Sequence, residues 1–164
     1  MNIEGFLLTS AQVAVALAGF AALISAFRRR DNTLSASEIA GRSMILELGL
    51  AAGFFGLLPF PIDAFLNEFN LVGVWRICSL ILVIFLTVWG VYNYRRAVNV
   101  AVHDGLSNGV QMSFNIVLIV INASLIANIL IFGIAALYMA GVLYMLVAGG
   151  VQFMIFVYQY AQQS

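Results

Sequence analysis

Polar side chains that could do chemistry are few in this chain, and most of them interrupt long apolar stretches. The carboxylate of Glu47 lies a few residues into an apolar run that begins near Ser43. At 1.5 Å per residue, this places it roughly 6–8 Å below a membrane surface. Ionisable groups at such depth are costly and are functional candidates. The depth of Glu47 therefore predicts that its carboxylate coordinates an ion or carries a proton. The alternative is a side chain that reaches back to the interface or pairs with Arg42 or Arg28.

Carboxamides form the second group, and most of them lie in the stretch 113–137. At 100° per residue, Asn115 and Asn122 share one helix face, and Asn128 lies roughly opposite with Ser113 and Ser124. An amide facing lipid would leave strong hydrogen-bonding groups unpaired. We therefore expect a central helix. It either lines a pore with one face or is held between neighbours by hydrogen bonds worth about 1 kcal/mol per pair. Thr87, on the preceding apolar stretch, is expected to bond only to its own helix.

Three further polar residues lie within or at the end of apolar stretches. Gln12 and Gln152 are the expected partners of these amides. Arg76 is expected to reach the outer interface and pair with Asp63 or Glu68. The alternative is a ring of positive charge at an outer vestibule, which would favour anions. The candidate ion-path residues are thus Gln12, Glu47, Arg76, Asn115, Asn122, Asn128 and Gln152.

Enzyme chemistry has little support in the sequence. The chain has one His, one Cys and no Lys. No pair of His, Cys or acidic residues has metal-ligand spacing, and no Gly-rich phosphate loop is present. Zero net charge and the lack of a basic patch outside two short loops argue against a nucleic-acid partner. We predict a protein that is not an enzyme and that needs no metal or cofactor.

The apolar stretches that contain these polar residues are predicted to be helices that cross a lipid bilayer. Of the 164 residues, 63% are hydrophobic and only 9% are charged, whereas a soluble domain carries roughly a quarter charged residues. Apolar runs of about 20 residues predict spanning helices at 3–27, 43–60, 72–94, 113–137 and 141–160. Almost no polar residue separates the last two, so we place their turn near Tyr138–Gly141, with one broken segment as the alternative. The prediction is an all-α integral membrane bundle in a single domain, 1–164.

A short additional helix is expected after the second span. Pro59 and Pro61 each lack a backbone donor and end that span. One apolar stripe then follows at i, i+3, i+4 and i+7, formed by Ile62, Phe65, Leu66 and Phe69. This pattern predicts an interfacial helix on the outer membrane surface. A simple loop is the alternative.

Arginine placement sets the predicted orientation. Six of the seven Arg follow the first span or the third, at positions 28, 29, 30, 42, 95 and 96. Cytoplasmic loops are enriched in cations. Five spans therefore place the N-terminus outside and the C-terminus in the cytoplasm.

Small residues recur on the first two spans, with Ala14, Ala18 and Ala22 on one and Gly49 and Gly53 on the other. Such ridges allow close backbone approach, either within one chain or between copies. A resemblance rests on Ala18–Ala22, Arg28–Arg30, Arg42, Leu46–Glu47, Leu57–Pro59, Trp75–Arg76 and Ser79. Over about the first hundred residues, the chain is similar to small, uncharacterised bacterial polytopic membrane proteins. The resemblance implies a membrane fold and a bacterial inner membrane, and implies no activity.

The function expected from the sequence is a homo-oligomeric inner-membrane channel or pore for small ions. Five short helices leave little room for the two rocking halves of a transporter, whereas several copies around an axis could enclose a pore. The alternative is a non-transporting membrane subunit that binds or senses a partner. A small enzyme or solute carrier is a third reading. Membrane lipid, further copies of the chain and a small ion are the expected partners.

Overall fold

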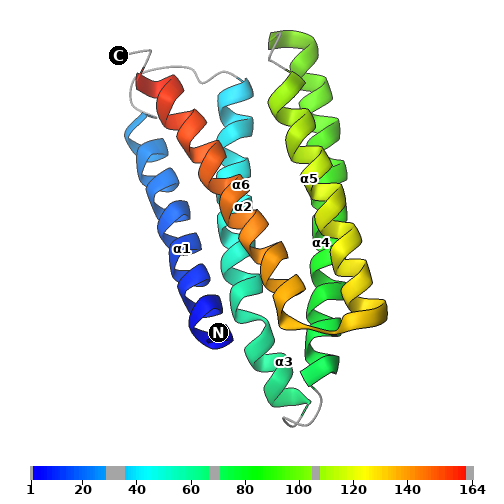
Figure 1. The fold of residues 1–164 in the computed structure, drawn as a ribbon. Coiled ribbons are helices and arrows are strands. Elements are labelled where there is room, and N and C mark those ends of the chain that lie inside the picture. Colours follow the sequence, from blue (N-terminus) through cyan, green and yellow to red (C-terminus); the bar gives the residue numbers. More distant parts are fainter. Residues whose placement is uncertain (1, 29–35, 67–70, 105–107, 162–164) are drawn as a thin grey trace. The chain divides into compact units, whose positions relative to one another are not determined.

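The chain folds entirely into helices over the residues that the structure, a computed structural model, describes: 2–28, 36–66, 71–104 and 108–161. In order these are α1 (Ile3–Arg28), α2 (Ala36–Leu57), α3 (Pro59–Phe65), α4 (Leu71–Asp104), α5 (Asn108–Ala127), the π-helical turn η1 (Asn128–Phe132) and α6 (Ala135–Ala161) (Figure 1). The predicted all-α bundle is confirmed.

Within the described residues, five helical segments are long and apolar enough to cross a membrane. They are Ile3–Leu23, Ser43–Phe65, Leu71–Arg96, Ser113–Phe132 and Ala135–Ile155. The chain is thus of the multi-pass membrane class. The last boundary differs from the prediction: the turn lies at Gly133 and Ile134, whereas Tyr138 is inside α6. Gly133 has a φ of 61°, a left-handed conformation that favours glycine and ends a helix.

A short helix follows α2, as predicted, although the second apolar segment, Ser43–Phe65, includes it. α3 begins at Pro59, where a missing N–H costs nothing because the first turn of a helix leaves its N–H groups unpaired. It ends where the N–H of Leu66 donates to the carbonyl of Ile62 at 3.0 Å. Phe69, the last residue of the predicted stripe, lies outside the described residues. The location of α3 at a membrane surface stays a prediction.

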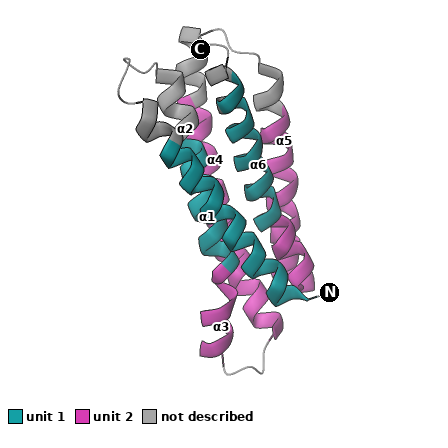
Figure 2. Cartoon of the chain, turned by 90° about the vertical axis from the view of Figure 1, so that its left-hand side faces the viewer, with its two compact units in different colours: residues 1–56, 142–164 teal, residues 57–141 magenta. Residues whose placement is uncertain are grey.

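The chain divides into two compact units, residues 1–56 with 142–164 (unit 1) and residues 57–141 (unit 2) (Figure 2). In unit 1, α1 and α2 approach closely through small residues. A Cβ added at Gly49 would lie 3.2 Å from the carbonyl oxygen of Ala14, and one at Gly56 would lie 3.0 Å from that of Leu7. The small-residue ridge of α1 therefore has a partner in the same chain.

The C-terminal part of α6 also belongs to unit 1. A Cβ at Gly149 would lie 3.5 Å from the Cβ of Leu48 on α2. Further along, Phe153 packs against the buried pair Ala21 and Ile45. Three helices thus share the core of this unit.

Unit 2 is built around the antiparallel pair α4 and α5. Gly90 on α4 faces Leu118 on α5, because a Cβ at Gly90 would lie 2.7 Å from a methyl group of that leucine. Near the other end of the pair, Gly141 of α6 lies against Leu82 and Leu125. These contacts show which residues of α4 and α5 lie at the same height along the helix axes.

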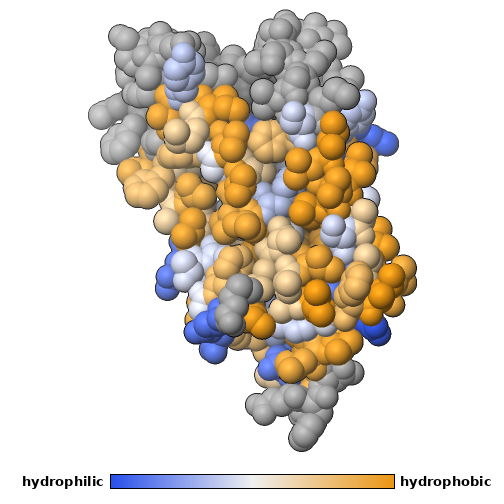
Figure 3. Space-filling view, viewed as in Figure 1, coloured by the Kyte–Doolittle hydropathy of each residue, from blue (hydrophilic) through white to orange (hydrophobic). Residues whose placement is uncertain are grey.

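Large apolar side chains cover much of the described surface (Figure 3). Among the most exposed are Val88 at 66%, Ile119 at 68%, Leu130 at 71% and Met154 at 69%. Monomeric soluble proteins rarely expose contiguous apolar surface on this scale. A lipid environment accounts for it, because the solvent is then as apolar as the side chains.

Candidate functional site

Unit 2 has its most completely bonded polar group at the end of α5, around Asn128. This side chain is 0% exposed. Its Nδ2 donates to Ser79 Oγ at 2.9 Å and to the carbonyl of Ile134 at 3.0 Å. Its Oδ1 accepts from the N–H of Ile134 at 2.8 Å. One carboxamide therefore links η1, α4 and the start of α6.

A polar side chain such as Asn128 is needed here because the helix breaks within an apolar region. The end of a helix leaves carbonyls without intrahelical partners, and the start of the next leaves N–H groups without partners. In lipid no water can satisfy them. The N–H of Gly133 donates to the carbonyl of Asn128 at 2.8 Å, and the Asn128 side chain satisfies both backbone groups of Ile134. Asn128 thus stabilises the turn between η1 and α6.

This placement changes the interpretation of Asn128 as an ion-path candidate. Both donors of its amide are used, and its oxygen already accepts one hydrogen bond. A side chain with 0% exposure also has no surface to offer a hydrated ion in this conformation. Asn128 is structural in this conformation.

Asn122 bonds to α4 as well as to its own helix. Its Nδ2 donates to the carbonyl of Leu118 at 2.9 Å, and its Oδ1 lies 3.4 Å from Thr87 Oγ1, which donates to it. The prediction that Thr87 bonds only to its own helix is wrong. Ser124 donates to the carbonyl of Val120 on its own helix at 2.9 Å.

The prediction of two opposite polar faces on the fourth span is also wrong for Asn122 and Asn128. Both side chains bond to α4, because they lie on either side of the stripe of Leu118 and Leu125. Within the single chain, this helix is also largely exposed. Only 11% of its apolar window is buried, against 50% for the window in Ser43–Phe65. Side chains that donate to carbonyls of their own helix do not need a hydrogen-bond partner on another helix.

A second buried amide, Asn93 on α4, was not singled out by sequence reasoning. It is 5% exposed, and its Nδ2 donates to the carbonyl of Trp89 at 3.0 Å. Its Oδ1 is buried without a hydrogen-bond partner. Since Gly90 faces Leu118 in the antiparallel pair, Asn93 comes level with Asn115. The half-buried Asn115 makes no hydrogen bond to another described residue through its side chain.

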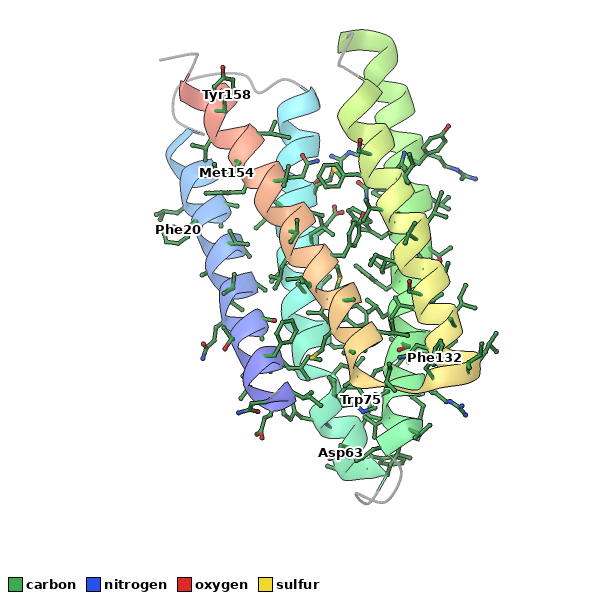
Figure 4. The ribbon with its side chains drawn as sticks, in the orientation of Figure 1. Phe20, Asp63, Trp75, Phe132, Met154 and Tyr158 are labelled. Carbon is green, nitrogen blue, oxygen red and sulfur yellow. The ribbon has the colours of Figure 1, made fainter. Side chains whose placement is uncertain are left out.

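Arg76 lies on α4 near the turn at Gly133. Its Nε is buried without a hydrogen-bond partner, and a Cβ at Gly133 would lie 3.3 Å from it. On α3, Oδ1 of Asp63 is likewise buried and unpartnered. The expected pairing of Arg76 with Asp63 is therefore not found among the described residues, and Glu68 lies outside them. Figure 4 shows Asp63 on α3 and Trp75, the neighbour of Arg76, on α4.

The remaining candidates lie in unit 1. Gln12 is exposed on α1, and Glu47 and Gln152 are half-buried on α2 and α6. Neither glutamine side chain makes a hydrogen bond to another described residue. The side chains of Arg28 and Arg42, the predicted partners of Glu47, lie outside the described part. Among the described residues, the two glutamine side chains of unit 1 thus have no hydrogen-bond partner, whereas the amides of Asn122 and Asn128 in unit 2 are engaged.

Sequence reasoning also missed Ser79 as the partner of Asn128. Ser79 lies on the preceding helix, α4, where a single serine gives no periodic signal. The pairing becomes visible only when the relative heights of α4 and α5 along their axes are known. A usable signal was the glycine five residues after Asn128, since glycine is common just past a helix end.

In the described part of the chain, no group of three or more His, Cys, Asp or Glu side chains could hold a metal ion. Comparison with protein-family models, with curated proteins and with solved structures finds no match. Function must therefore be argued from the site.

Proposed function

We propose that the protein is a homo-oligomeric channel or pore for small ions, with Glu47 and Gln152 beside the ion path. The observation that supports this most is the incomplete burial of both side chains on membrane-length helices of unit 1. The part of each polar side chain that stays exposed would be unfavourable against lipid. Water in a path between copies would solvate it.

Glu47 and Gln152 lie at neighbouring levels. Leu48 on α2 faces Gly149 on α6, and Ile45 packs with Phe153. The two helices are antiparallel, so Glu47 and Gln152 are within about one turn, 5.4 Å, along the helix axes. A carboxylate next to an amide offers oxygen ligands suited to a hydrated cation.

The bonded amides of unit 2 fit a supporting role. Thr87 with Asn122 connects α4 to α5, and Ser79 with Asn128 connects α4 to η1. Both amides use most of their own hydrogen-bonding capacity. Hydrogen bonds between membrane helices contribute roughly 0.6–2 kcal/mol each. We propose that unit 2 stiffens the protomer and that unit 1 contributes the conducting surface.

The proposed orientation places the N-terminus outside, the C-terminus in the cytoplasm and α3 on the outer surface of a bacterial inner membrane. Glu47 then lies near the cytoplasmic mouth, where its charge would attract cations. In a Cys78→Ala background, a cysteine placed within 31–42 or 97–111 should be shielded from an impermeant thiol reagent in intact cells. One placed within 67–70 should react. Labelling of the arginine-rich loops from outside would contradict this orientation.

A second candidate is a non-transporting membrane subunit that binds or senses a partner. The engagement of Asn122 and Asn128 inside unit 2 favours it, because it removes two residues from any ion path. In either case we propose a protein without catalytic activity, metal or cofactor.

Ion flux in liposomes separates these functions. The purified protein should conduct, and Glu47→Gln should lower the preference for cations over anions, since it removes charge while keeping shape. Glu4→Gln is the matched control, because Glu4 is exposed in the first turn of α1. Each variant is checked by its size-exclusion profile. If the wild type gives no flux at any voltage, pH or tension, the channel proposal is contradicted and the partner-binding subunit is the better proposal. Unchanged flux and selectivity in both Glu47→Gln and Gln152→Leu would remove these residues from the path.

A further inference from the structure

Helix α1 has two opposite faces, and only one of them has a partner in unit 1. Leu7, Ala14 and Ala21 are 0–1% exposed, and this side packs against α2. The opposite face is centred on Gln12, which is exposed. Gly19 lies one heptad after Gln12. Gly5, one heptad before it, is covered by the side chain of Asn2, whose Nδ2 would lie 3.1 Å from a Cβ at Gly5. A Cβ at Gly19 would meet nothing within 4 Å.

The Gln12 amide needs a hydrogen-bonding partner that the described part of unit 1 does not provide. It lies in the middle of the span Ile3–Leu23, where lipid cannot bond to it. The carboxylate of Glu47, in the same unit, is too far away to serve. Because Gly49 and Gly53 face the region of Ala14, Glu47 lies roughly 10 Å from Gln12 along the axis.

A second copy of the chain meets the requirement without further assumption. Copies inserted in the same direction place their Gln12 side chains at the same depth. A carboxamide is both donor and acceptor, so two of them across a two-fold axis can satisfy each other. Gly19, one heptad after Gln12, has no side chain to hold the backbones apart. The face is therefore complementary to itself in both shape and hydrogen bonding.

We infer that two copies of this protein contact each other through α1, with Gln12 of one copy hydrogen-bonded to Gln12 of the next and with Gly19 allowing close approach. The inference rests on the homo-oligomer in the proposed function and specifies its contact face. It places Gln12 in the interface between copies, not in the ion path that Glu47 and Gln152 border.

Disulfide cross-linking in native membranes tests the face, in a Cys78→Ala background that has no other thiol. Gly19→Cys should form a covalent dimer on mild oxidation. Val13→Cys is the matched control, because Val13 is 46% exposed but about 100° away around the helix. Adding Gln12→Leu to Gly19→Cys should weaken association roughly five- to thirtyfold, the equivalent of one amide hydrogen-bond pair in a membrane. Gln12→Asn, which keeps the amide, should restore most of it.

The outcomes separate this inference from the channel. Equal cross-linking at Gly19→Cys and Val13→Cys, or an oligomer of normal mass without the Gly19→Cys dimer, overturns the α1 contact and leaves the assembly standing. A dimer that Gln12→Leu does not weaken rules out the amide pair. A wild type that is monomeric in mild detergent and in nanodiscs overturns both proposals. Size-exclusion profiles identify any variant that fails to fold. If Gln12→Leu does not fold, cross-linking of the Gln12→Asn variant is compared with that of the wild-type residue instead.

Discussion

Asn128 and Ser79 are 49 residues apart in sequence, and Asn128 Nδ2 donates to Ser79 Oγ at 2.9 Å. The same amide satisfies both backbone groups of Ile134. Asn128→Leu removes all three bonds and leaves the Ile134 N–H and carbonyl unpaired, so it should lower the free energy of unfolding by about 2–4 kcal/mol. Unfolding in mixed micelles with increasing dodecyl sulfate, followed by circular dichroism, measures the change.

Ser79→Ala is the graded control for this prediction. It removes one hydrogen bond and leaves the two bonds to Ile134 in place, so the loss should be only about 1 kcal/mol. Equal losses from Asn128→Leu and Ser79→Ala would mean that the turn does not depend on the amide. Asn128→Leu at wild-type stability would contradict the structural role outright.

The turn itself predicts a strong effect at Gly133. Gly133→Ala places a Cβ 2.5 Å from Val72 Cγ1 and imposes a φ of 61° on a residue with a side chain. The left-handed conformation alone costs about 1–2 kcal/mol. Adding Val72→Ala should recover the part due to the clash and leave the part due to φ. Gly150→Ala, with nothing within 4 Å, is the control and should be neutral or slightly stabilising by the same unfolding assay.

Fold class could be predicted from the sequence, because apolar length is a local property. The first three spans agree with the prediction to within a few residues, apart from extensions where the helix continues beyond the apolar part, as in α4 to Asp104. The turn after η1 was misplaced because residues 129–137 are apolar apart from Gly133. No change in polarity marks that break, and only the glycine identifies it.

The candidate site was less predictable, because depth in the membrane is visible in sequence and hydrogen-bond partners are not. Asn128 and Gln12 look alike as amides in apolar runs. The structure gives Asn128 three hydrogen bonds, whereas Gln12 is exposed. Which amide is structural depends on the matching of α4 with α5, a tertiary property. Nor could the sequence reveal that the oxygen of Asn93 is buried without a partner.

Close packing of α1 on α2 predicts a difference between two glycines on α2. At Gly56 a Cβ would lie 3.0 Å from the backbone oxygen of Leu7, whereas at Gly53 the nearest atom is 3.8 Å away. Gly56→Ala should therefore push the helices apart and destabilise unit 1 by about 1–3 kcal/mol, the usual cost of overpacking. Gly53→Ala should be tolerated, and only a larger change such as Gly53→Leu or Ala18→Leu should disrupt the contact. Thermal stability by size-exclusion recovery compares them, and equal loss from both alanine variants would contradict the packing.

The unpartnered oxygen of Asn93 predicts the opposite of the effect at Asn128. A buried acceptor without a donor costs about 1–3 kcal/mol, and leucine has a similar volume and no polar atom. The Asn93 Nδ2 bonds only to the carbonyl of Trp89 on the same helix, so removing it leaves little unpaired. Asn93→Leu should therefore be neutral or stabilising by up to about 2 kcal/mol in the unfolding assay.

Asn115 supplies the control, because it is level with Asn93 across the α4–α5 pair. If the two amides do not bond, Asn93→Leu and Asn115→Leu should act additively, with a coupling energy below about 0.5 kcal/mol in a double-mutant cycle. A coupling of 1 kcal/mol or more would show a hydrogen bond between them in the membrane. Destabilisation by Asn93→Leu without coupling to Asn115 would instead mean that another donor, such as a bound water, satisfies the oxygen. Either result contradicts an unpaired acceptor, and only additive effects with no loss of stability support it.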